Sequence, residues 1–262
     1  MIMDFALVLF ILLVATGAIW ALDYLLWAPG RAKARKGGKE PLVVEYARAF
    51  FPVILIVFLL RSFLVEPFRI PSGSMLPSLL IGDFILVNKF AYGIRLPIVN
   101  KKIIDLGGPK RGEVMVFRFP TEPTVNYIKR VVGIPGDRVL YKDKRLYING
   151  KPMEQSDPRS YAGGGDLTGQ ISQVTENLDG VSHEILLSDR PDRVVEITVP
   201  EGHYFVMGDN RDHSNDSRYW GYVPDRNLVG RAFLVWFSWD HTDRPEWFWQ
   251  RIVWNRIGNT IR

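Results

Sequence analysis

Residues 112–139 read GEVMVFRFPTEPTVNYIKRVVGIPGDRV, and they contain short apolar runs that are bounded by Gly and Pro. Runs of this length, rich in Val, Ile and aromatic residues, predict β-strands. Further runs of the same kind are DFILVNKF (83–90), KRLYING (144–150), VVEITVP (194–200), GHYFVMGDN (202–210) and RAFLVWFSW (231–239). No long amphipathic helix separates these runs, so we expect antiparallel sheets folded as a barrel or sandwich, not a parallel α/β sheet.

The stretch 155–192 interrupts this series of strands, because it is rich in Gly, Ser and Asp. It predicts an inserted loop or a small subdomain. The expected fold class is therefore mainly β: an antiparallel domain over residues 66–262 with an insertion at about 155–192.

Two apolar stretches near the N-terminus predict transmembrane helices. Residues 5–22 carry no charge, over about the length that spans a hydrocarbon core. The second stretch, residues 49–60, reaches spanning length when it is extended to about 46–65, and its alternative is a buried helix. A cleavable signal peptide would have basic residues before a shorter apolar stretch, whereas Asp4 precedes this one, so we expect the helix to stay attached.

A basic segment, residues 31–40, lies between the two apolar stretches and contains Arg31, Lys33, Arg35, Lys36 and Lys39. Short loops rich in Lys and Arg remain in the cytoplasm, which puts the domain after residue 65 on the outer side of the membrane. A basic run can also be a solvated face or a nucleic-acid patch. A loop held between two membrane helices is poorly placed for nucleic acid, and we expect no such partner.

The composition excludes several classes of chemistry. The chain has 262 residues, 47% of them hydrophobic, with no Cys and four His. A disordered protein, thiol catalysis, disulfides and thiolate metal sites are thereby excluded. The net charge of +5 suits an anionic partner, and the position of the charges decides which one.

The segment FRIPSGSMLPSL, residues 68–79, is the first candidate site. Pro71 and Pro77 interrupt regular structure, and Gly73 allows a sharp turn between two serines. A Ser-Gly-Ser turn is usually a surface loop. This one lies close behind the second apolar stretch and among apolar residues that a solvated loop would not need.

Lys129 is the second candidate, in a strand whose alternate members Tyr127 and Val131 share its face. If that face is inward, the lysine is buried without an adjacent carboxylate, and its pKa falls below the usual value of about 10.4. A neutral lysine is a general base and can activate a serine hydroxyl. The alternative is a strand lysine that reaches solvent beside Arg130.

The third candidate is GHYFVMGDNRDHSNDSRYWG, residues 202–221, which crowds five charged residues into one turn. Dense alternating charge usually indicates a salt-bridged turn, although one of its hydroxyls can still serve a site. The charged residues are Asp209, Arg211, Asp212, Asp216 and Arg218.

Together these segments resemble the motifs of bacterial type I signal peptidases. The matching stretches, in order, are PSGSM (71–75), GDFILVNKFAYG (82–93), RGEVMVFRFP (111–120), YIKRVVGIPGD (127–137) and GDNRDHSNDSRYWG (208–221). The resemblance covers most of the chain, including the two apolar stretches. It implies a membrane-bound serine endopeptidase with a largely antiparallel β fold, which needs no metal or organic cofactor.

The resemblance also implies roles for individual residues. Ser74 corresponds to the nucleophile and Lys129 to the general base. Ser72, with the Ser74 backbone N–H, corresponds to the oxyanion hole, and Ser214 to a hydroxyl that orients the lysine. The residues that match structural positions bracing the third segment are Asp209 and Arg218.

The substrates implied by the resemblance are signal peptides of exported preproteins, cut after small residues in an A-x-A-like pattern. Shallow apolar pockets for these residues are expected, lined by Phe68, Ile70, Met75, Leu79, Tyr127 and Ile128, each of which can equally be a core residue. The expected location is the bacterial inner membrane, and we expect a monomer.

Two other classes of function remain open at this stage. One is a Ser–His–Asp hydrolase that uses His213 or His203 with Asp209. The other is a membrane-anchored binding module without chemistry.

The C-terminal stretch combines Trp and Arg, residues that favour the membrane interface, so we also expect a membrane lipid partner. Trp236 and Trp239 fit a strand core equally well. Trp247 and Trp249, beside Pro245 and Glu246, are expected to be exposed.

Overall fold

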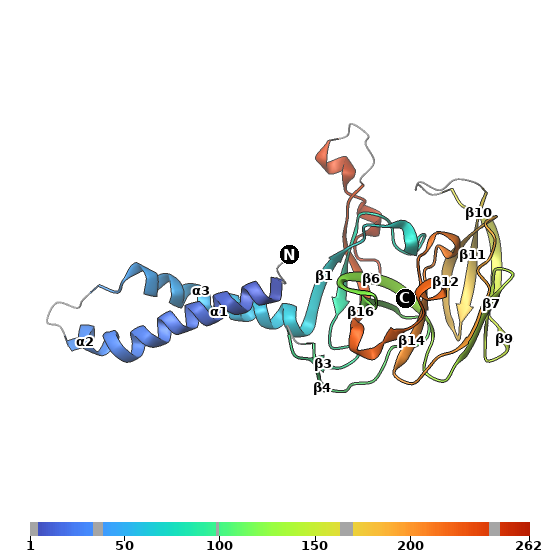
Figure 1. Cartoon of the computed structure of the whole chain (residues 1–262). Helices are drawn as coiled ribbons and strands as arrows, with labels where there is room; N and C mark the ends of the chain where they lie inside the picture. Colours follow the sequence, from blue (N-terminus) through green and yellow to red (C-terminus); the bar gives the residue numbers. More distant parts are fainter. Residues whose placement is uncertain (1–4, 34–38, 98–99, 163–169, 241–246) are drawn as a thin grey trace. The chain divides into compact units, whose positions relative to one another are not determined.

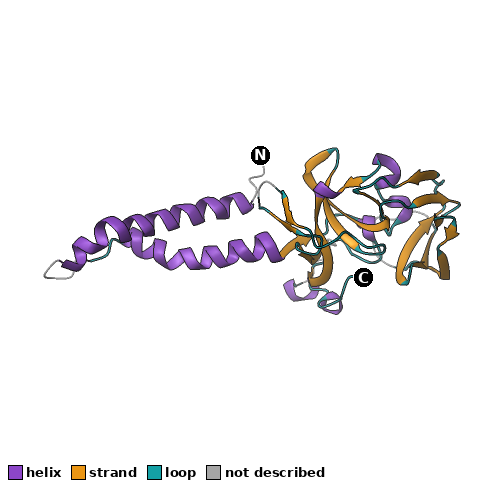
Figure 2. Ribbon diagram, turned by 90° about the horizontal axis from the view of Figure 1, so that it is seen from below, coloured by secondary structure: helices purple, strands orange, loops and turns teal. Residues whose placement is uncertain are grey.

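The computed structural model describes residues 5–33, 39–97, 100–162, 170–240 and 247–262. The chain forms two compact units, one of residues 1–65 with 95–103 and one of residues 66–94 with 104–262. Figure 1 follows the chain through both units, and Figure 2 shows that the first is helical and the second is built from strands.

The helical unit contains two apolar helices that are long enough to cross a membrane, over Ala6–Arg31 and Leu42–Leu64. Their parts are α1 (Phe5–Leu22), the π-helix η1 (Asp23–Trp27), α2 (Ala28–Lys33), α3 (Leu42–Leu59) and the π-helix η2 (Leu60–Leu64). The second helix begins about one turn before the predicted residue 46, because Pro41 in an extended conformation starts it. Of the predicted basic loop, residues 34–38 lie outside the described residues.

The two helices pack through aromatic side chains. The ring of Phe10 lies 6.1 Å from that of Phe58, and the ring of Trp20 lies 5.6 Å from that of Phe51. Since the residue numbers rise in α1 as they fall in α3, the helices are antiparallel (Figure 2). Gly17 allows this approach, because a Cβ there would lie 2.9 Å from the Phe51 ring.

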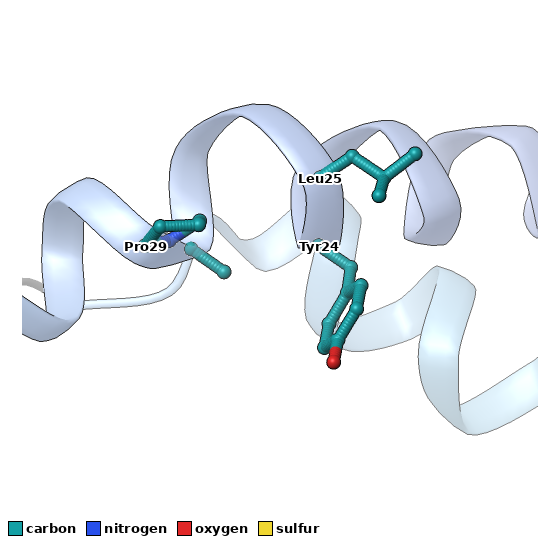
Figure 3. A pocket seen from close by; sticks show the side chains of 4 residues that line it. Tyr24, Leu25 and Pro29 are labelled. Atoms are coloured by element: carbon teal, nitrogen blue, oxygen red, sulfur yellow. The ribbon is translucent and has the colours of Figure 1, made fainter.

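A shallow pocket on the first helix is lined by Tyr24, Leu25, Ala28 and Pro29 (Figure 3). None of these four side chains is a carboxylate, an amine or an imidazole. Its one polar side chain, the Tyr24 phenol, has no group among these lining residues that would activate it as an acid, a base or a nucleophile.

The second unit is built on a seven-stranded sheet of order β1-β2-β16-β5-β6-β14-β15. Its strands are β1 (Val65–Arg69), β2 (Asp83–Asn88), β16 (Leu228–Ser238), β5 (Val114–Phe119), β6 (Glu122–Gly133), β14 (His203–Met207) and β15 (Val223–Pro224). In the centre of this sheet β5 and β6 are antiparallel, with Met115 opposite Lys129. This register fixes the face of the sheet on which the lysine lies.

Three smaller sheets complete the strands. One has the order β13-β7-β8-β9, with β13 (Val195–Thr198), β7 (Arg138–Lys142), β8 (Arg145–Ile148) and β9 (Lys151–Pro152). Another pairs β3 (Ile94–Arg95) with β4 (Lys102–Ile104). The third has the order β10-β11-β12, with β10 (Glu154–Ser160), β11 (Ile171–Leu178) and β12 (Val181–Ser188). The predicted insertion thus contains most of a three-stranded sheet, and its residues 163–169 lie outside the described residues.

The predicted fold class is confirmed, because the strand pairs from β2 to β15 in the large sheet, and those of the sheets β13-β7-β8-β9 and β10-β11-β12, are antiparallel. Residues 125–139, the second half of the stretch quoted first, divide between β6 and β7. Pro135 and Gly136 turn the chain between these strands, and Gly136 has a positive φ of 88°. The longest α-helix among the described residues of this unit is α4 (Ser217–Trp220).

The core of the β unit lies on both faces of the large sheet. One buried cluster consists of Ile70, Met75, Leu79, Ile85, Val87, Val114, Val116, Ala232 and Val235. Another consists of Tyr92, Met115, Phe117, Val131, Tyr204, Val206, Val223 and Leu228. Val114 and Val116 belong to the first cluster and Met115 and Phe117 to the second, so β5 is buried on both faces.

Gly230 is required where β16 crosses β2. A Cβ at this position would lie 2.3 Å from the Asn88 backbone oxygen, which no rotamer change can relieve. We therefore expect Gly230→Ala to lower the free energy of unfolding by at least about 2 kcal/mol in thermal or urea unfolding. Arg231→Ala, on the exposed side of the same strand, is the control and should cost less than about 1 kcal/mol. Equal losses for the two variants would contradict the close approach.

Candidate active site

Ser74 lies in a short 3₁₀ turn, η3 (Gly73–Met75), that follows β1. The loop containing it is closed by two backbone hydrogen bonds, from Ile70 N–H to the Asp83 carbonyl (2.8 Å) and from Gly82 N–H to the Ile70 carbonyl (3.0 Å). Met75 is completely buried and anchors the turn in the core. These contacts fix the position of Ser74, which is itself only 9% exposed.

Lys129 comes from the centre of β6 and meets Ser74 at the surface of the sheet. Its Nζ lies 2.6 Å from Ser74 Oγ and donates a 3.0 Å hydrogen bond to the Ile128 carbonyl. The side chain is 4% exposed, and its Nζ is 5.5 Å from the centre of the Tyr127 ring. Two residues that are 55 positions apart in the chain are therefore in direct contact.

The surroundings of Lys129 favour a neutral amine. Burial lowers its pKa to about 8, while the negative charges of Asp216 and Asp209 act in the opposite direction. Neither carboxylate is free to pair with the amine. Asp216 receives hydrogen bonds from Arg218, and Asp209 receives them from Arg130.

Ser72 and Ser214 lie near this pair in different ways. Ser72 is exposed, and its Oγ lies 3.5 Å from Ser74 Oγ. The Ser214 Oγ is buried and has no hydrogen-bond partner within the described part of the chain, and so none to Lys129. The hydroxyl is nevertheless next to the site, because it adjoins Gly208, which also touches the Ser74 carbonyl.

Gly208 leaves no room for a side chain. A Cβ on this residue would lie 2.3 Å from Ser214 Oγ and 2.4 Å from the Ser74 carbonyl oxygen. The loop that begins here therefore packs its backbone directly against the turn of Ser74.

The charged residues of this loop pair mostly with residues outside it. Arg130, the neighbour of Lys129, donates from Nε and Nη2 to Asp209 at 2.8 and 2.7 Å, and both side chains are 1% exposed. Arg211 forms a buried ion pair with Glu176 of β11. Asp216 and Arg218 are paired within the turn, at 2.8 Å. The predicted salt-bridged turn thus extends into a wider buried network.

The apolar residues predicted to line pockets differ in how far they are buried. Phe68, Tyr127 and Ile128 are half-buried. The fully or almost fully buried ones are Ile70, Met75 and Leu79, whose cluster contacts Phe68 and Ile128 but not Tyr127. Only the three half-buried residues present surface that a peptide could touch.

The histidines named for a Ser–His–Asp arrangement do not contact the serine among the described residues. His203 Nδ1 lies 2.8 Å from the Glu201 carbonyl, and His213 Nε2 is buried without a partner in the described structure. The histidine near Asp209 is His183, at 3.9 Å, whose pKa burial lowers to about 4.

Two residues at this site were not singled out from the sequence. Arg130 could have been recognised from the sequence. A second cation in an apolar strand needs a buried carboxylate, and Asp209 lies at the end of another apolar strand. Asn210 gave no signal, since an asparagine in a polar turn is ordinary. In the structure it is 1% exposed and bonded to the turn of Ser74.

Comparison with known proteins gives a consistent result. The family described as "Signal peptidase, peptidase S26" matches residues 43–239. Signal peptidase I of Pseudomonas aeruginosa is 50% identical, over 91% of this chain and 94% of the relative. That of Haemophilus influenzae is 36% identical, over 89% and 86%. A crystal structure of a signal peptidase I from Enterococcus faecalis is 29% identical over 48% of this chain and 98% of the other, with a TM-score of 0.31.

Asp209 is expected to stabilise the fold through Arg130. Burial raises the pKa of its carboxyl, but Arg130 outweighs burial and holds the pKa below the usual range. Asp209→Ala leaves a buried guanidinium unpaired, so we expect a loss of about 3–5 kcal/mol in unfolding free energy. Because the folded pKa is depressed, this difference is present above about pH 4 and shrinks as the pH falls below it.

The control is the exposed pair Arg138–Glu196, whose side chains are 69% and 51% exposed. Glu196→Ala should cost less than about 1 kcal/mol. Denaturant unfolding at pH 7 and pH 3 measures both variants. A loss at Asp209 no greater than that at Glu196 would show that buried Arg130 does not depend on this carboxylate.

Proposed function

The chain belongs to the peptidase S26 family of bacterial type I signal peptidases, and on this basis we propose that Ser74 and Lys129 form its catalytic dyad. Membership makes it an enzyme that removes signal peptides from secreted preproteins. Its two apolar helices fit a membrane-anchored protein. The finer assignments below are proposals that rest on the geometry of the described residues.

The contact of 2.6 Å between Lys129 Nζ and Ser74 Oγ carries the proposal. A general base must lie within hydrogen-bond distance of the proton that it accepts, and only a neutral amine has the free electron pair. Burial favours that neutral form. Neutral Lys129 takes the proton of Ser74 as its oxygen attacks the peptide carbonyl, which gives a tetrahedral oxyanion and an ammonium group.

Collapse of this intermediate breaks the C–N bond, and Lys129 returns its proton to the leaving amine. The mature protein departs, while the signal peptide remains as an ester on Ser74. A water molecule, deprotonated by the same amine, then hydrolyses the ester and restores the serine. We propose that the oxyanion is held by Ser72 Oγ and the Ser74 backbone N–H.

Ser214 is proposed to orient the Lys129 amine. Its buried hydroxyl has no partner among the described residues, so its hydrogen-bonding capacity is available when the amine reorganises. Asp209 and Arg218 keep the proposed structural role, because each is paired and buried in the surrounding network.

We propose cleavage after small residues, as in an A-x-A-like pattern. Phe68 and Ile128 are half-buried and pack against the buried cluster that contains Met75, the neighbour of Ser74, whereas Tyr127 packs against the cluster on the opposite face of β6. Ile70, Met75 and Leu79 of that first cluster are fully or almost fully buried, so they offer no surface of their own to a peptide. Shallow pockets of this kind suit alanine-sized side chains and exclude larger ones.

The proposed location is the bacterial inner membrane, with residues 1–65 as the anchor and 66–262 as the peptidase domain on the outer side. The basic residues between the two helices support this orientation, because short positively charged loops stay in the cytoplasm. The proposed working form is a monomer.

The dyad makes a pH-dependent prediction. With a lysine pKa of about 8, the amine is protonated below this pH, so kcat should rise about tenfold per unit and level off above it. Lys129→Arg should be as inactive as Lys129→Ala, because a guanidinium stays protonated. Mass spectrometry of a model preprotein incubated with each protein, and with Ser74→Ala, gives the measurement.

Substitution of His203 and His213, the two histidines named for the Ser–His–Asp alternative, by Gln is the control, and it should leave cleavage intact. Turnover by Lys129→Arg, or by Ser74→Ala, would contradict the dyad. Loss of activity in the histidine variant alone would favour a Ser–His–Asp hydrolase instead.

We also propose that the C-terminal segment docks on lipid. Trp247 and Trp249 are 81% and 67% exposed, and Trp254 is 64% exposed. Indole rings favour the headgroup region of a bilayer. Arg256 of the same segment is paired with Asp83, so the exposed indoles carry this proposal. Trp236 is 45% exposed and Trp239 is half-buried, while Arg244, Pro245 and Glu246 lie outside the described residues.

Removal of two indole rings should weaken this docking. A truncated protein lacking residues 1–65 is expected to sediment with anionic vesicles, and the Trp247→Ala, Trp249→Ala double variant to sediment several-fold less. Cleavage of a soluble peptide should be nearly unchanged. Tyr219→Ala, another aromatic residue that is 52% exposed, is the control. Equal sedimentation of the double variant and the unsubstituted protein would reject lipid docking.

A further inference from the structure

Asn210 bonds to the turn of Ser74 through both its side chain and its backbone. Its Nδ2 donates to the Gly73 carbonyl at 3.0 Å, and its backbone N–H donates to the Ser74 carbonyl at 3.2 Å. The residue is 1% exposed, so these bonds are shielded from competing water. Two successive carbonyls of the turn are thus held by one residue from a distant part of the chain.

The orientation of the Gly73 carbonyl determines that of the Ser74 N–H. Both groups belong to one planar trans peptide, in which the C=O and the N–H point in opposite directions. The carbonyl accepts from Asn210 Nδ2 and from Leu76 N–H, at 3.0 and 3.2 Å, so the plane cannot rotate without breaking these bonds. A donor that fixes this carbonyl therefore also fixes the direction of the Ser74 N–H.

Asn210 is itself held by three elements. Leu186 of β12 forms a parallel bridge with Asn210, and its N–H donates to the Asp209 carbonyl at 2.9 Å. On one side Asp209 is bound by Arg130 of β6. On the other Arg211 is bound by Glu176 of β11. The inserted sheet and the central sheet together leave Asn210 little freedom to shift.

We propose that Asn210 is a positioning residue for the oxyanion hole: its amide fixes the Gly73–Ser74 peptide so that the Ser74 N–H faces the developing oxyanion. The proposal rests on the proposed function, in which that N–H is a donor. Asn210 acts through the peptide plane and touches neither the substrate nor Lys129 Nζ. Its effect belongs to the transition state and not to substrate binding, because the carbonyl oxygen gains negative charge only as Ser74 attacks it.

The test uses the full-length protein in detergent micelles and compares Asn210→Leu with Asn227→Leu. Leucine fills a similar volume but cannot donate a hydrogen bond. Asn227 is a matched control, because it is 8% exposed and its Nδ2 donates to the Arg118 carbonyl at 2.9 Å. The two variants therefore lose equivalent buried hydrogen bonds, only one of which ends on the turn of Ser74. Asn210→Ala is the second variant at the site.

We expect Asn210→Leu to lower kcat about 10- to 100-fold, less than the loss of a whole oxyanion donor, which costs about 10²- to 10³-fold. The KM should stay within about twofold and the pH profile of kcat should not move. The inhibition constant of a peptide aldehyde, which forms a tetrahedral adduct with a serine hydroxyl, should rise by the same factor as kcat falls. Asn227→Leu should keep kcat while losing a similar amount of thermal stability.

Several results would overturn the proposal. A kcat for both Asn210 variants equal to that of Asn227→Leu would reduce Asn210 to a structural role. A shifted pH profile would assign its effect to Lys129, and a raised KM with unchanged kcat would assign it to substrate binding. Failure of both Asn210 variants to fold, while Asn227→Leu folds, would also assign it a purely structural role. Ser74→Ala in the same assay separates the two proposals, because cleavage by that variant contradicts the dyad itself.

Discussion

Removal of the Lys129 amine from water is the constraint on which the rest of this site depends. A cationic lysine at 4% exposure would need a carboxylate partner, and none is offered, because Asp209 and Asp216 are each held by an arginine. The amine therefore has a depressed pKa, of about 8, and meets a hydroxyl instead. An amine that loses its proton near pH 8 follows from burial, because each nearby carboxylate is already paired with an arginine.

This arrangement explains why so many charges are buried around one amine. Arg130 with Asp209 and Arg211 with Glu176 are almost inaccessible pairs, each of which satisfies its own charge. His183 lies 3.5 Å from Glu176 and 3.9 Å from Asp209, and burial lowers its pKa to about 4, so it is neutral at pH 7. Buried pairs contribute little net stability compared with apolar residues, but they fix position. Here they fix the loop from Gly208 to Arg218 against the turn of Ser74.

The inserted sheet supports the loop after Gly208, a role that its composition did not predict. Its strands β11 and β12 supply Glu176, His183 and the backbone of Leu186, all of which contact the loop after Gly208. Arg111 joins its β11–β12 turn at Asp179 to Asp137, which precedes β7. A segment whose sequence interrupts the strand series is therefore part of the support of the proposed catalytic turn.

The sequence by itself determined the two apolar helices, the antiparallel strands and the candidate residues Ser74 and Lys129. Each of these follows from local pattern: uncharged length, short apolar runs between Gly and Pro, and motifs read in order. It could not determine that Asn210 reaches Gly73, that Arg130 meets Asp209, or that the predicted pocket residues Met75 and Leu79 lie wholly in the core. These are contacts between residues far apart in the chain, set by strand register and by which face each loop packs against. Only the tertiary structure decided them, because burial and hydrogen bonding depend on the neighbours that folding brings together.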